Sequence, residues 1–305
     1  MKKVLITGAN GFIGSSLIRE LLKYNIFIIA IGKQNSNNIP NNKNVKFVPL
    51  DLTNIAELEH IIKDRDIDTF YHLAWAGSAG PDRSNSVLQL QNAQWTIDCV
   101  RLAKKIGCKR FVCAGSIMEY ETFAATDEQG NKPGMGYIYG GSKLIAHCMS
   151  KSVAAEIGIE HVWAIITNAY GEGEISPRFV NTTIRKIINN EILSFTSATQ
   201  NYDFVHISDV VKAFYLIGEK GKPFCNYLIG SSNARPLKEF IIELRDSLAP
   251  GKELMFGEIP FTGVNLPIKK FDCSQTEKDT GFKAEVLFSD GVRRTRDWII
   301  KEDNK

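Results

Sequence analysis

Short apolar segments alternate with longer mixed segments through the first half of the chain. Buried strands are predicted where these runs are rich in β-branched residues, at Lys3–Thr7, Phe27–Ile31, Val45–Pro49, Thr69–Ala74, Arg110–Ala114 and His161–Ile166. Helices are predicted after Gly14 and at Ile55–Ile62, Val87–Ile106 and Tyr137–Ile157. This alternation predicts an α/β, Rossmann-like fold built on a doubly wound parallel sheet.

The pattern becomes irregular after about Tyr170. Prolines divide the second half into short elements, at Pro177, Pro223, Pro250, Pro260 and Pro267. From the pattern alone this is a change of composition, with no internal repeat and no low-complexity segment.

Composition limits the classes of function. The chain has 305 residues, 44% of them hydrophobic and 23% charged, which is ordinary for a globular enzyme. A net charge of +3 with no basic stripe gives no reason to expect nucleic acid as a partner. No apolar run is as long as a membrane span and no leader pattern precedes the first strand, so we expect a cytoplasmic protein without membrane contact. The six cysteines show no metal-binding spacing, and no metal is expected.

A glycine-rich turn joins the first strand to the helix that follows it. Glycines there permit a tight turn, and the helix N-terminus offers unpaired N–H groups to a pyrophosphate. Strand, glycine turn and helix in this order predict a dinucleotide site. The predicted cofactor contacts here are Gly8, Asn10, Gly11, Phe12, Ile13 and Gly14.

The end of the second strand bears on the choice of cofactor. NAD-binding domains place an acidic residue there to bind the ribose 2′-hydroxyl. This chain has Gly32-Lys33 instead, which removes the carboxylate and offers a cation to a 2′-phosphate. NADP(H) is therefore favoured over NAD(H).

Tyr139 and Lys143 are four residues apart, so on a helix their side chains share one face. A cation beside a phenol favours the phenolate, and the pair can then give and take a proton at neutral pH. The same spacing is common on surface helices, and it gains weight only from the dinucleotide motif.

With the glycine-rich turn and the Tyr139–Lys143 pair taken together, the chain resembles the extended short-chain dehydrogenase/reductase family, in the branch acting on nucleotide sugars. The likeness runs nearly end to end. It implies that Asp51 and Leu52 contact the adenine, that Ala74, Trp75 and Ala76 line the cofactor, and that Ser116 completes a catalytic triad with Tyr139 and Lys143. Lys143 is implied to bond the nicotinamide ribose as well.

By the same resemblance, residues 1–170 form the NADP-binding domain with the triad. Residues 171–305 form mainly a smaller α/β lobe for the nucleotide sugar, with some chain returning to the main domain.

The residues after Ser116 narrow the reaction. Dehydratases of this family carry an Asp-Glu pair there, whereas this chain has Ile117 and Met118, which exchange no proton. Dehydration is therefore not expected, and reduction and 4-epimerisation remain. Because a reductase consumes NADPH and Gly32-Lys33 favours that cofactor, we expect NADPH-dependent reduction of a nucleotide-linked 4-keto-6-deoxy sugar. A nucleotide-sugar 4-epimerase is the alternative, and a dinucleotide-binding protein without catalysis is a third reading that the intact Tyr139 and Lys143 disfavour.

Substrate contacts are implied at Ser78, Met118, Asn168, Arg178 and Tyr202, with Arg83 a further candidate. Tyr202 stands where many relatives place an arginine that holds the diphosphate. The family also implies a homodimer in which Val87–Ile106 and Tyr137–Ile157 pair with their copies as a four-helix bundle.

Overall fold

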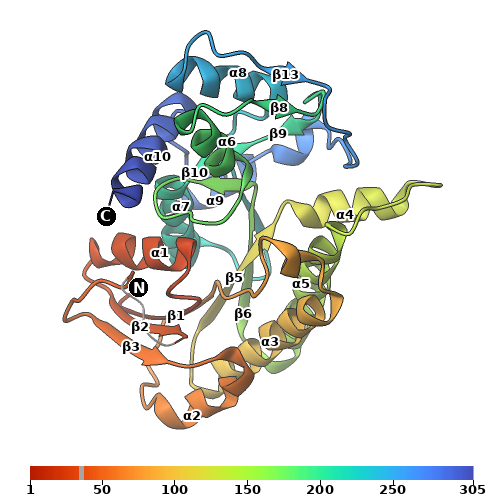
Figure 1. Ribbon diagram of the computed structural model, residues 1–305. Helices are drawn as coiled ribbons and strands as arrows, with labels where there is room; N and C mark the ends of the chain where they lie inside the picture. The colour runs from red at the N-terminus through yellow and green to blue at the C-terminus, as the bar shows by residue number, and fades with distance from the viewer. Residues whose placement is uncertain (34–37, 305) are drawn as a thin grey trace.

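A seven-stranded parallel sheet forms the centre of the molecule, in a computed structural model that describes residues 1–33 and 38–304 (Figure 1). The strand order is β11-β6-β5-β4-β1-β2-β3, and each neighbouring pair is parallel. The strands are β1 (Lys3–Thr7), β2 (Phe27–Gly32), β3 (Val45–Pro49), β4 (Thr69–His72), β5 (Arg110–Ser116), β6 (Glu160–Ile166) and β11 (Asn226–Ile229). The chain order reverses at β1, so connections run in both directions from the centre, as predicted for a doubly wound fold.

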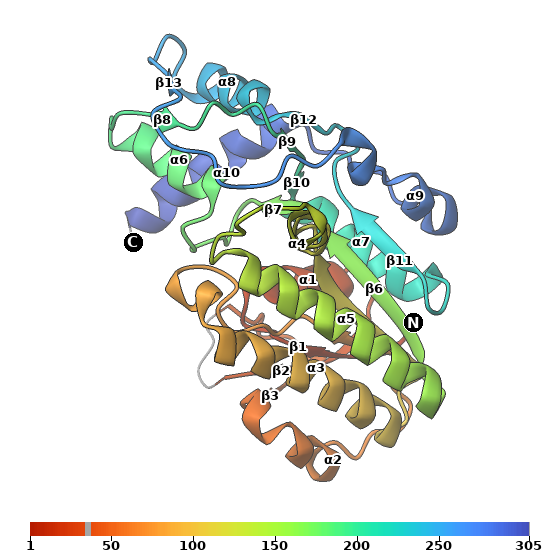
Figure 2. The same ribbon diagram turned by 90° about the vertical axis from the view of Figure 1, so that its right-hand side faces the viewer.

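Helices cover both faces of this sheet. One core contains buried residues of α1 (Phe12–Leu22) and α7 (Ile207–Lys220), which pack side by side on one face. The other contains residues of α3 (Ser86–Lys105) and α5 (Tyr137–Ile157), the pair in front of the sheet in Figure 2. Except for the edge strand β3, the strands are buried on both sides, which explains their largely apolar sequences.

A smaller unit lies above the carboxyl ends of the strands (Figure 1). Its core is rich in phenylalanine and joins α6 (Phe179–Ile188), α8 (Leu237–Leu248) and α10 (Phe288–Asp303). Two-stranded sheets flank these helices: β7 (Asn168–Tyr170) with β10 (Phe204–His206), β9 (Asn201–Tyr202) with β12 (Arg235–Pro236), and β8 (Ser194–Phe195) with β13 (Met255–Phe256). The remaining elements are η1 (Leu52–Glu57), α2 (Leu58–Ile61), η2 (Pro81–Ser84), α4 (Met118–Asp127), η3 (Ile268–Phe271) and α9 (Ser274–Thr280).

The predicted α/β fold and every predicted strand are confirmed, but one helix is wrong. The helix expected at 55–62 is a 3₁₀ helix, η1, followed by the single turn α2. The reason is local: the Asp51 carboxylate accepts a bond from the Thr53 N–H, which starts a tight turn before the expected helix. Strand β4 also ends at His72, two residues earlier than expected.

The chain crosses between the two units more than once. After Tyr170 it builds α6 in the upper unit, then returns to supply α7 and the edge strand β11 to the main sheet. We keep the division near residue 170 as a proposed boundary. Within the residues that the structure describes, no helix is long and apolar enough to cross a membrane.

Candidate active site

In the turn after β1, Gly8 and Gly14 occupy positions that leave no room for a side chain. A Cβ at Gly8 (φ +72°) would lie 2.6 Å from the backbone nitrogen of Ala74, and one at Gly14 would collide with the Gly8 carbonyl oxygen. No side chain caps the N-terminus of α1, and its first turn has no acidic residue. Its free N–H groups and dipole therefore suit an anion such as a pyrophosphate.

Asn10 connects this turn to the end of β2. Its side-chain amide donates to the carbonyl of Lys33 over 2.7 Å, while its Oδ1 atom is buried without a hydrogen-bond partner. A Cβ on Gly32 would lie 2.5 Å from that same Oδ1 atom. An unpaired buried acceptor beside an uncapped helix fits a dinucleotide, which brings hydroxyl donors to the turn.

Lys33 and Asp51, which were assigned to different parts of the cofactor, form an ion pair. The Lys33 Nζ atom lies 2.9 Å from Oδ2 of Asp51, and both side chains reach solvent. The Thr53 N–H and then Lys33 hold the pKa of Asp51 below its usual range. The ammonium group thus has a partner where a 2′-phosphate was expected. Leu52, the other predicted adenine contact, begins η1 and packs against the core.

Tyr139 and Lys143 lie on the inner face of α5, and their side chains are 7% and 4% exposed. The Lys143 ammonium donates to the carbonyl of Ala114 over 2.7 Å and lies 3.6 Å from the ring centre of Trp75. It is 5.9 Å from the ring centre of Tyr139. The predicted pair is therefore brought together, with the lysine fixed to the end of β5.

Ser116 is the last residue of β5, two residues after Ala114, whose carbonyl accepts the bond from Lys143. Its Oγ atom accepts a bond from the backbone N–H of Met118 over 3.2 Å. The hydroxyl hydrogen therefore stays free to donate to another group. Ile117 is buried, and Met118 begins α4 half-exposed above it.

The loop after β4 closes over Tyr139. Trp75 meets the tyrosine ring edge to face at 5.9 Å, and its Nε1–H donates to Gln89 over 2.8 Å. The backbone of Ala76 is held by Asn92 through two bonds, of 2.8 and 2.9 Å. The loop is thereby fixed to α3, and Trp75 forms a wall of the site.

Arg83 lies over the ring of Tyr139. Its guanidinium carbon is 4.1 Å from the Tyr139 ring centre, and Nη1 donates to the Ser78 carbonyl over 2.9 Å. Ser78 thus contributes its backbone to hold Arg83. A guanidinium on a phenol face is an attractive contact, and sequence spacing gave no sign of it because it depends on how the loop folds.

Glu121 is an acidic residue that the sequence analysis missed. It lies on α4 and is partly buried, and the loss of hydration raises its pKa to about 7, opposed by the charge of Arg83. A raised pKa near a predicted catalytic tyrosine marks a candidate functional group. The only signal in the sequence was a carboxylate five residues after Ser116.

A cavity of about 400 Å³ opens in the upper unit near Tyr202. Its walls are aromatic and polar: Pro177, Phe179, Thr182, Thr183, Lys186, Leu193, Ser194, Phe195, Thr196, Gln200, Tyr202, Leu237, Ile259 and Phe261. Tyr202 is thus on a cavity wall, as a substrate contact requires.

Two other predicted substrate residues have partners within the protein. Asn168 donates its amide to the carbonyl of Asp203 over 3.0 Å, tying β7 to β10. Arg178 precedes α6 and pairs with Glu174, its Nε atom 3.1 Å from Oε2. The Asn168 side chain is therefore engaged in a bond within the protein. Arg178 lies next to the cavity in sequence, since its neighbours Pro177 and Phe179 line the cavity.

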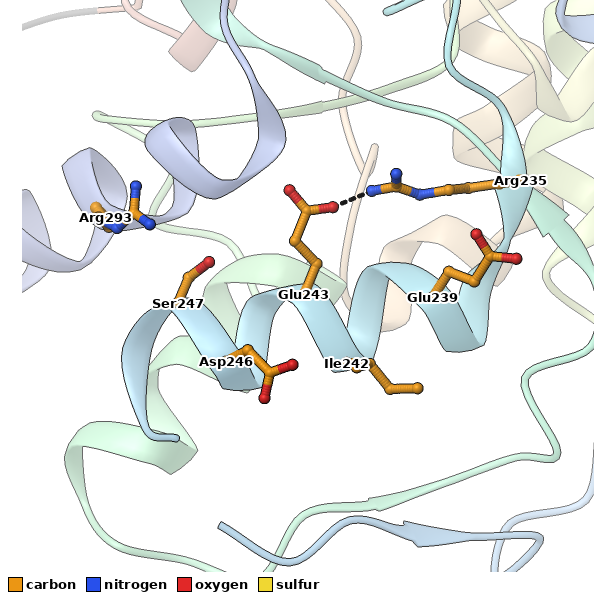
Figure 3. Close-up of a pocket in the computed structure, with 7 residues that line it drawn as sticks. All are labelled: Arg235, Glu239, Ile242, Glu243, Asp246, Ser247 and Arg293. Atoms are coloured by element: carbon orange, nitrogen blue, oxygen red, sulfur yellow. Dashed lines mark hydrogen bonds and ion pairs between the residues drawn. The ribbon is translucent and has the colours of Figure 1, made fainter. Parts of the chain in front are cut away.

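A second hollow, of about 510 Å³, lies along α8 and faces α10 (Figure 3). Arg235 forms an ion pair with Glu243 within it, and Arg293 approaches from α10. None of its lining residues belongs to the groups around Tyr139. Across residues 1–33 and 38–304, no cluster of three or more His, Cys, Asp or Glu side chains could hold a metal ion.

A model of the NAD dependent epimerase/dehydratase family matches residues 4–230. The chain belongs to this family. The match covers the glycine turn, the loop after β4 and the Tyr139–Lys143 pair. The resemblance drawn from the motifs, and the prediction of an enzyme of this type, are confirmed at the level of the family.

Individual relatives are distant and span the whole chain. The dTDP-4-dehydro-6-deoxyglucose reductase of Escherichia coli is 25% identical, over 95% of both chains. Among solved structures, a UDP-N-acetylglucosamine 4-epimerase from Methanobrevibacter ruminantium, in complex with UDP-N-acetylmuramic acid, has a TM-score of 0.83 at 21% identity, covering 99% of each chain. A UDP-glucuronic acid 4-epimerase from Bacillus cereus, bound to NAD, has a TM-score of 0.79 at 22% identity, covering 98% of this chain and 99% of the other. These structures establish the shared fold.

Proposed function

We propose that the protein reduces the keto group of a nucleotide-linked 4-keto-6-deoxy sugar with NADPH, giving a 6-deoxyhexose nucleotide. The observation that supports this most is the bond of Lys143, one helical turn after Tyr139, to Ala114 on β5, the strand that ends at Ser116. Buried Ile117 directly follows the serine. The tyrosine, lysine and serine can transfer a proton to a carbonyl oxygen. The Asp-Glu pair that dehydratases carry after the serine or threonine is absent, because Ile117 and Met118 occupy those positions.

The proposed reaction uses three groups of the chain. A bound nicotinamide supplies the hydride for the carbonyl carbon. Tyr139 gives its phenolic proton to the oxygen, which becomes the product hydroxyl. The Ser116 hydroxyl donates a hydrogen bond to that oxygen as negative charge develops on it. Lys143, held by Ala114 and Trp75, keeps a positive charge close to the phenol and favours its ionised form after transfer.

The preference for NADP(H) is also a proposal. It is supported by Gly32, which has no carboxylate to repel a 2′-phosphate, and by the solvent-exposed ammonium of Lys33. Binding of the phosphate requires Lys33 to turn from Asp51 or to share its charge, which is a small cost for an exposed pair.

For the substrate, we place the nucleotide in the cavity lined by Tyr202. Aromatic walls such as Phe195 and Phe261 suit a base, and Lys186 suits a phosphate. Arg83 and Glu121 lie toward Tyr139 and would face the sugar. Nucleotide sugars bound by structural relatives support this class of ligand.

A 4-epimerase is the second candidate, and it is favoured by the 4-epimerases among the structural relatives. In that reaction Tyr139 would take the proton of the sugar 4-hydroxyl and later return it, and a bound nicotinamide would accept the hydride and give it back. Such an enzyme retains its nicotinamide and needs no external reductant.

One experiment separates the two. Purified protein is mixed with NADPH, or NADH, and a panel of dTDP-, GDP-, CDP- and UDP-linked 4-keto-6-deoxy sugars, and nicotinamide absorbance is followed with mass analysis of the product. We expect NADPH to be consumed with one of these substrates, and the Tyr139→Phe variant to lose at least 100-fold in kcat. Conversion of unmodified UDP-hexoses without reductant would favour the epimerase, and full activity of Tyr139→Phe would refute both.

We also propose a homodimer formed through α3 and α5. Exposed apolar residues gather on these two adjacent helices, at Val87, Leu90, Leu144, Ile145 and Met149. Apolar side chains in such number on neighbouring helices indicate an association surface.

A further inference from the structure

A buried carboxylate lies directly beneath Ser116. Glu119 is 1% exposed and belongs to the first turn of α4. Its Oε1 atom accepts the Ser116 backbone N–H over 2.8 Å and the Trp163 Nε1–H over 2.9 Å. Its Oε2 atom is 2.9 Å from Nδ1 of His147. The carboxylate thus joins the serine to β6 and α5.

The surroundings are built around this group. A Cβ on Gly115 would lie 2.8 Å from the Glu119 Oε1 atom and would collide with Nε1 of Trp163, so only glycine leaves space for the bonds. Trp163 and the His147 ring are stacked, 4.4 Å apart and 3° from parallel. An ionised carboxylate that is out of water is costly unless it is hydrogen-bonded and paired with a charge.

A doubly protonated His147 would supply that charge, and its contacts fit this form. Its Nε2 atom is 3.0 Å from Oδ1 of Asn226, and the Lys151 ammonium donates to the same oxygen over 3.4 Å. The lysine bond identifies this atom as an acceptor. Both nitrogens of His147 therefore face oxygen acceptors, which is the arrangement of an imidazole that is protonated twice.

The strand end held by Glu119 carries more than the serine. Lys143 is bonded to the carbonyl of Ala114, two residues before Ser116, and His147 is one helical turn after Lys143 on α5. A shift of this strand end would displace the lysine anchor and the serine together. Displacements of about 1 Å can cost a catalytic site 100-fold in rate.

We propose that Glu119 is a positioning residue for the reaction, which fixes Ser116 through its backbone N–H, and that His147 is the counter-charge that keeps Glu119 ionised in place. This inference rests on the proposed function, in that Ser116 is taken as the group that bonds the carbonyl oxygen. It adds two residues, outside the triad, that act on the rate without touching substrate.

Two substitutions at Glu119 test the positioning. Glu119→Gln keeps an oxygen for both Ser116 and Trp163, so we expect kcat within threefold of the wild type with dTDP-4-keto-6-deoxyglucose and NADPH, or with the member of the sugar panel that is turned over. Glu119→Leu removes the acceptor, so kcat should fall at least tenfold while the substrate KM and the Kd of NADPH stay within threefold. Unchanged kcat in Glu119→Leu would overturn the proposal.

A charge cycle remains informative even if Glu119→Leu does not fold. His147→Phe leaves the carboxylate without its counter-charge, and we expect kcat to fall at least fivefold. Adding Glu119→Gln removes the unpaired charge, so the double variant should return to within threefold of Glu119→Gln alone. A purely structural role predicts additive losses instead, and that result would refute the charge pairing. His60→Gln, at an exposed histidine of α2, is the matched control and should leave kcat unchanged.

Ser116→Ala measured in parallel separates this inference from the proposed function. If Ser116→Ala keeps full turnover, the proposed role of the triad fails. If Ser116→Ala loses turnover while Glu119→Leu does not, only the positioning role of Glu119 fails. We expect Ser116→Ala to lose turnover and Glu119→Leu to add little to that loss, since both act through the same hydroxyl.

Discussion

At the scale of single residues, the catalytic tyrosine that we propose has two cations near it rather than one. Lys143 is fixed to the strand end, and Arg83 covers the ring at 4.1 Å. The charge of Arg83 also reaches Glu121, whose pKa burial raises to about 7. A carboxyl group that titrates near neutral pH close to Tyr139 makes the electrostatics of the site depend on pH.

Glu121 gives the first prediction at this scale. Its pKa is higher in the folded protein than the ordinary value of 4.5, so between pH 4.5 and 7 the folded state holds a proton that the unfolded state has released. The free energy of unfolding must then fall as pH rises through this window, by roughly 3 kcal/mol in total. Glu121→Gln removes this contribution. In urea denaturation from pH 5 to 8, the free energy of unfolding of the variant should depend less on pH than that of the wild type. The variant should therefore become more stable relative to the wild type as pH rises.

Glu128→Gln, at the exposed end of the same helix, is the control for that measurement. It should give a profile parallel to the wild type. A Glu121→Gln profile that is also parallel would show that the carboxyl group of Glu121 is not held protonated in the folded protein.

The sequence located some of these residues and not others for a physical reason. Tyr139, Lys143 and Ser116 lie on a helix and at a strand end, where spacing along the chain fixes their position. Arg83 comes from an irregular loop, and Glu119 gains its role only from Trp163 and His147, which are distant in sequence. Contacts of that kind cannot be inferred from periodicity.

At the scale of elements, the apolar runs located all six expected strands, because strands buried on both faces hold few polar residues. The upper unit was less predictable. Its strands are two or three residues long, too short to show a period, and its core depends on aromatic contacts such as Phe204 with Phe240 and Phe288. The stretch at 55–62 failed similarly, because one Asp51 side chain decided where the turn begins.

Helices α4 and α5 give a prediction at this scale. A Cβ at Gly140 would lie 2.5 Å from the Met118 carbonyl oxygen and would also collide with Thr122, so the glycine lets α4 approach the catalytic helix. Gly140→Ala should lower the free energy of unfolding by about 1 to 3 kcal/mol, as overpacking does. It should also reduce kcat, since Met118 and Ser116 would move with α4.

The neighbouring glycine is a matched control for this prediction. A Cβ at Gly141 would meet only Cγ2 of Thr122, at an ordinary 3.9 Å. Gly141→Ala should therefore stabilise the protein by about 0.5 to 1 kcal/mol, the gain expected from alanine in a helix. Urea denaturation of both variants decides the matter, and equal effects would contradict the packing argument.

At the scale of the whole molecule, the site that we propose draws on two units that the chain does not visit in sequence. Residues of β5 and α5 supply the triad that we propose, while Tyr202 and its cavity belong to the upper unit. Helix α7 and strand β11 then return to the main sheet. This interleaving ties the two units together covalently at several points. A composition shift near residue 170 could reveal that a second unit exists, but not which later segments return.

The outer face of α3 and α5 is the last feature of the whole molecule to interpret. Val87 is 78% exposed, Leu90 52% and Met149 49%, on helices whose inner faces pack against the sheet and carry Tyr139 and Lys143. If two copies bury these side chains, each removes apolar area from water worth about 25 cal/mol per Å².

Replacing Leu90 and Met149 together by arginine places four like charges in the shared surface. We expect this variant to elute as a monomer in size-exclusion chromatography with light scattering, where the wild type elutes as a dimer. Ile192→Arg, at a residue 72% exposed beyond α6, should leave the dimer intact. A wild-type protein that is monomeric at micromolar concentration, or a double variant that still dimerises, would rule out this surface.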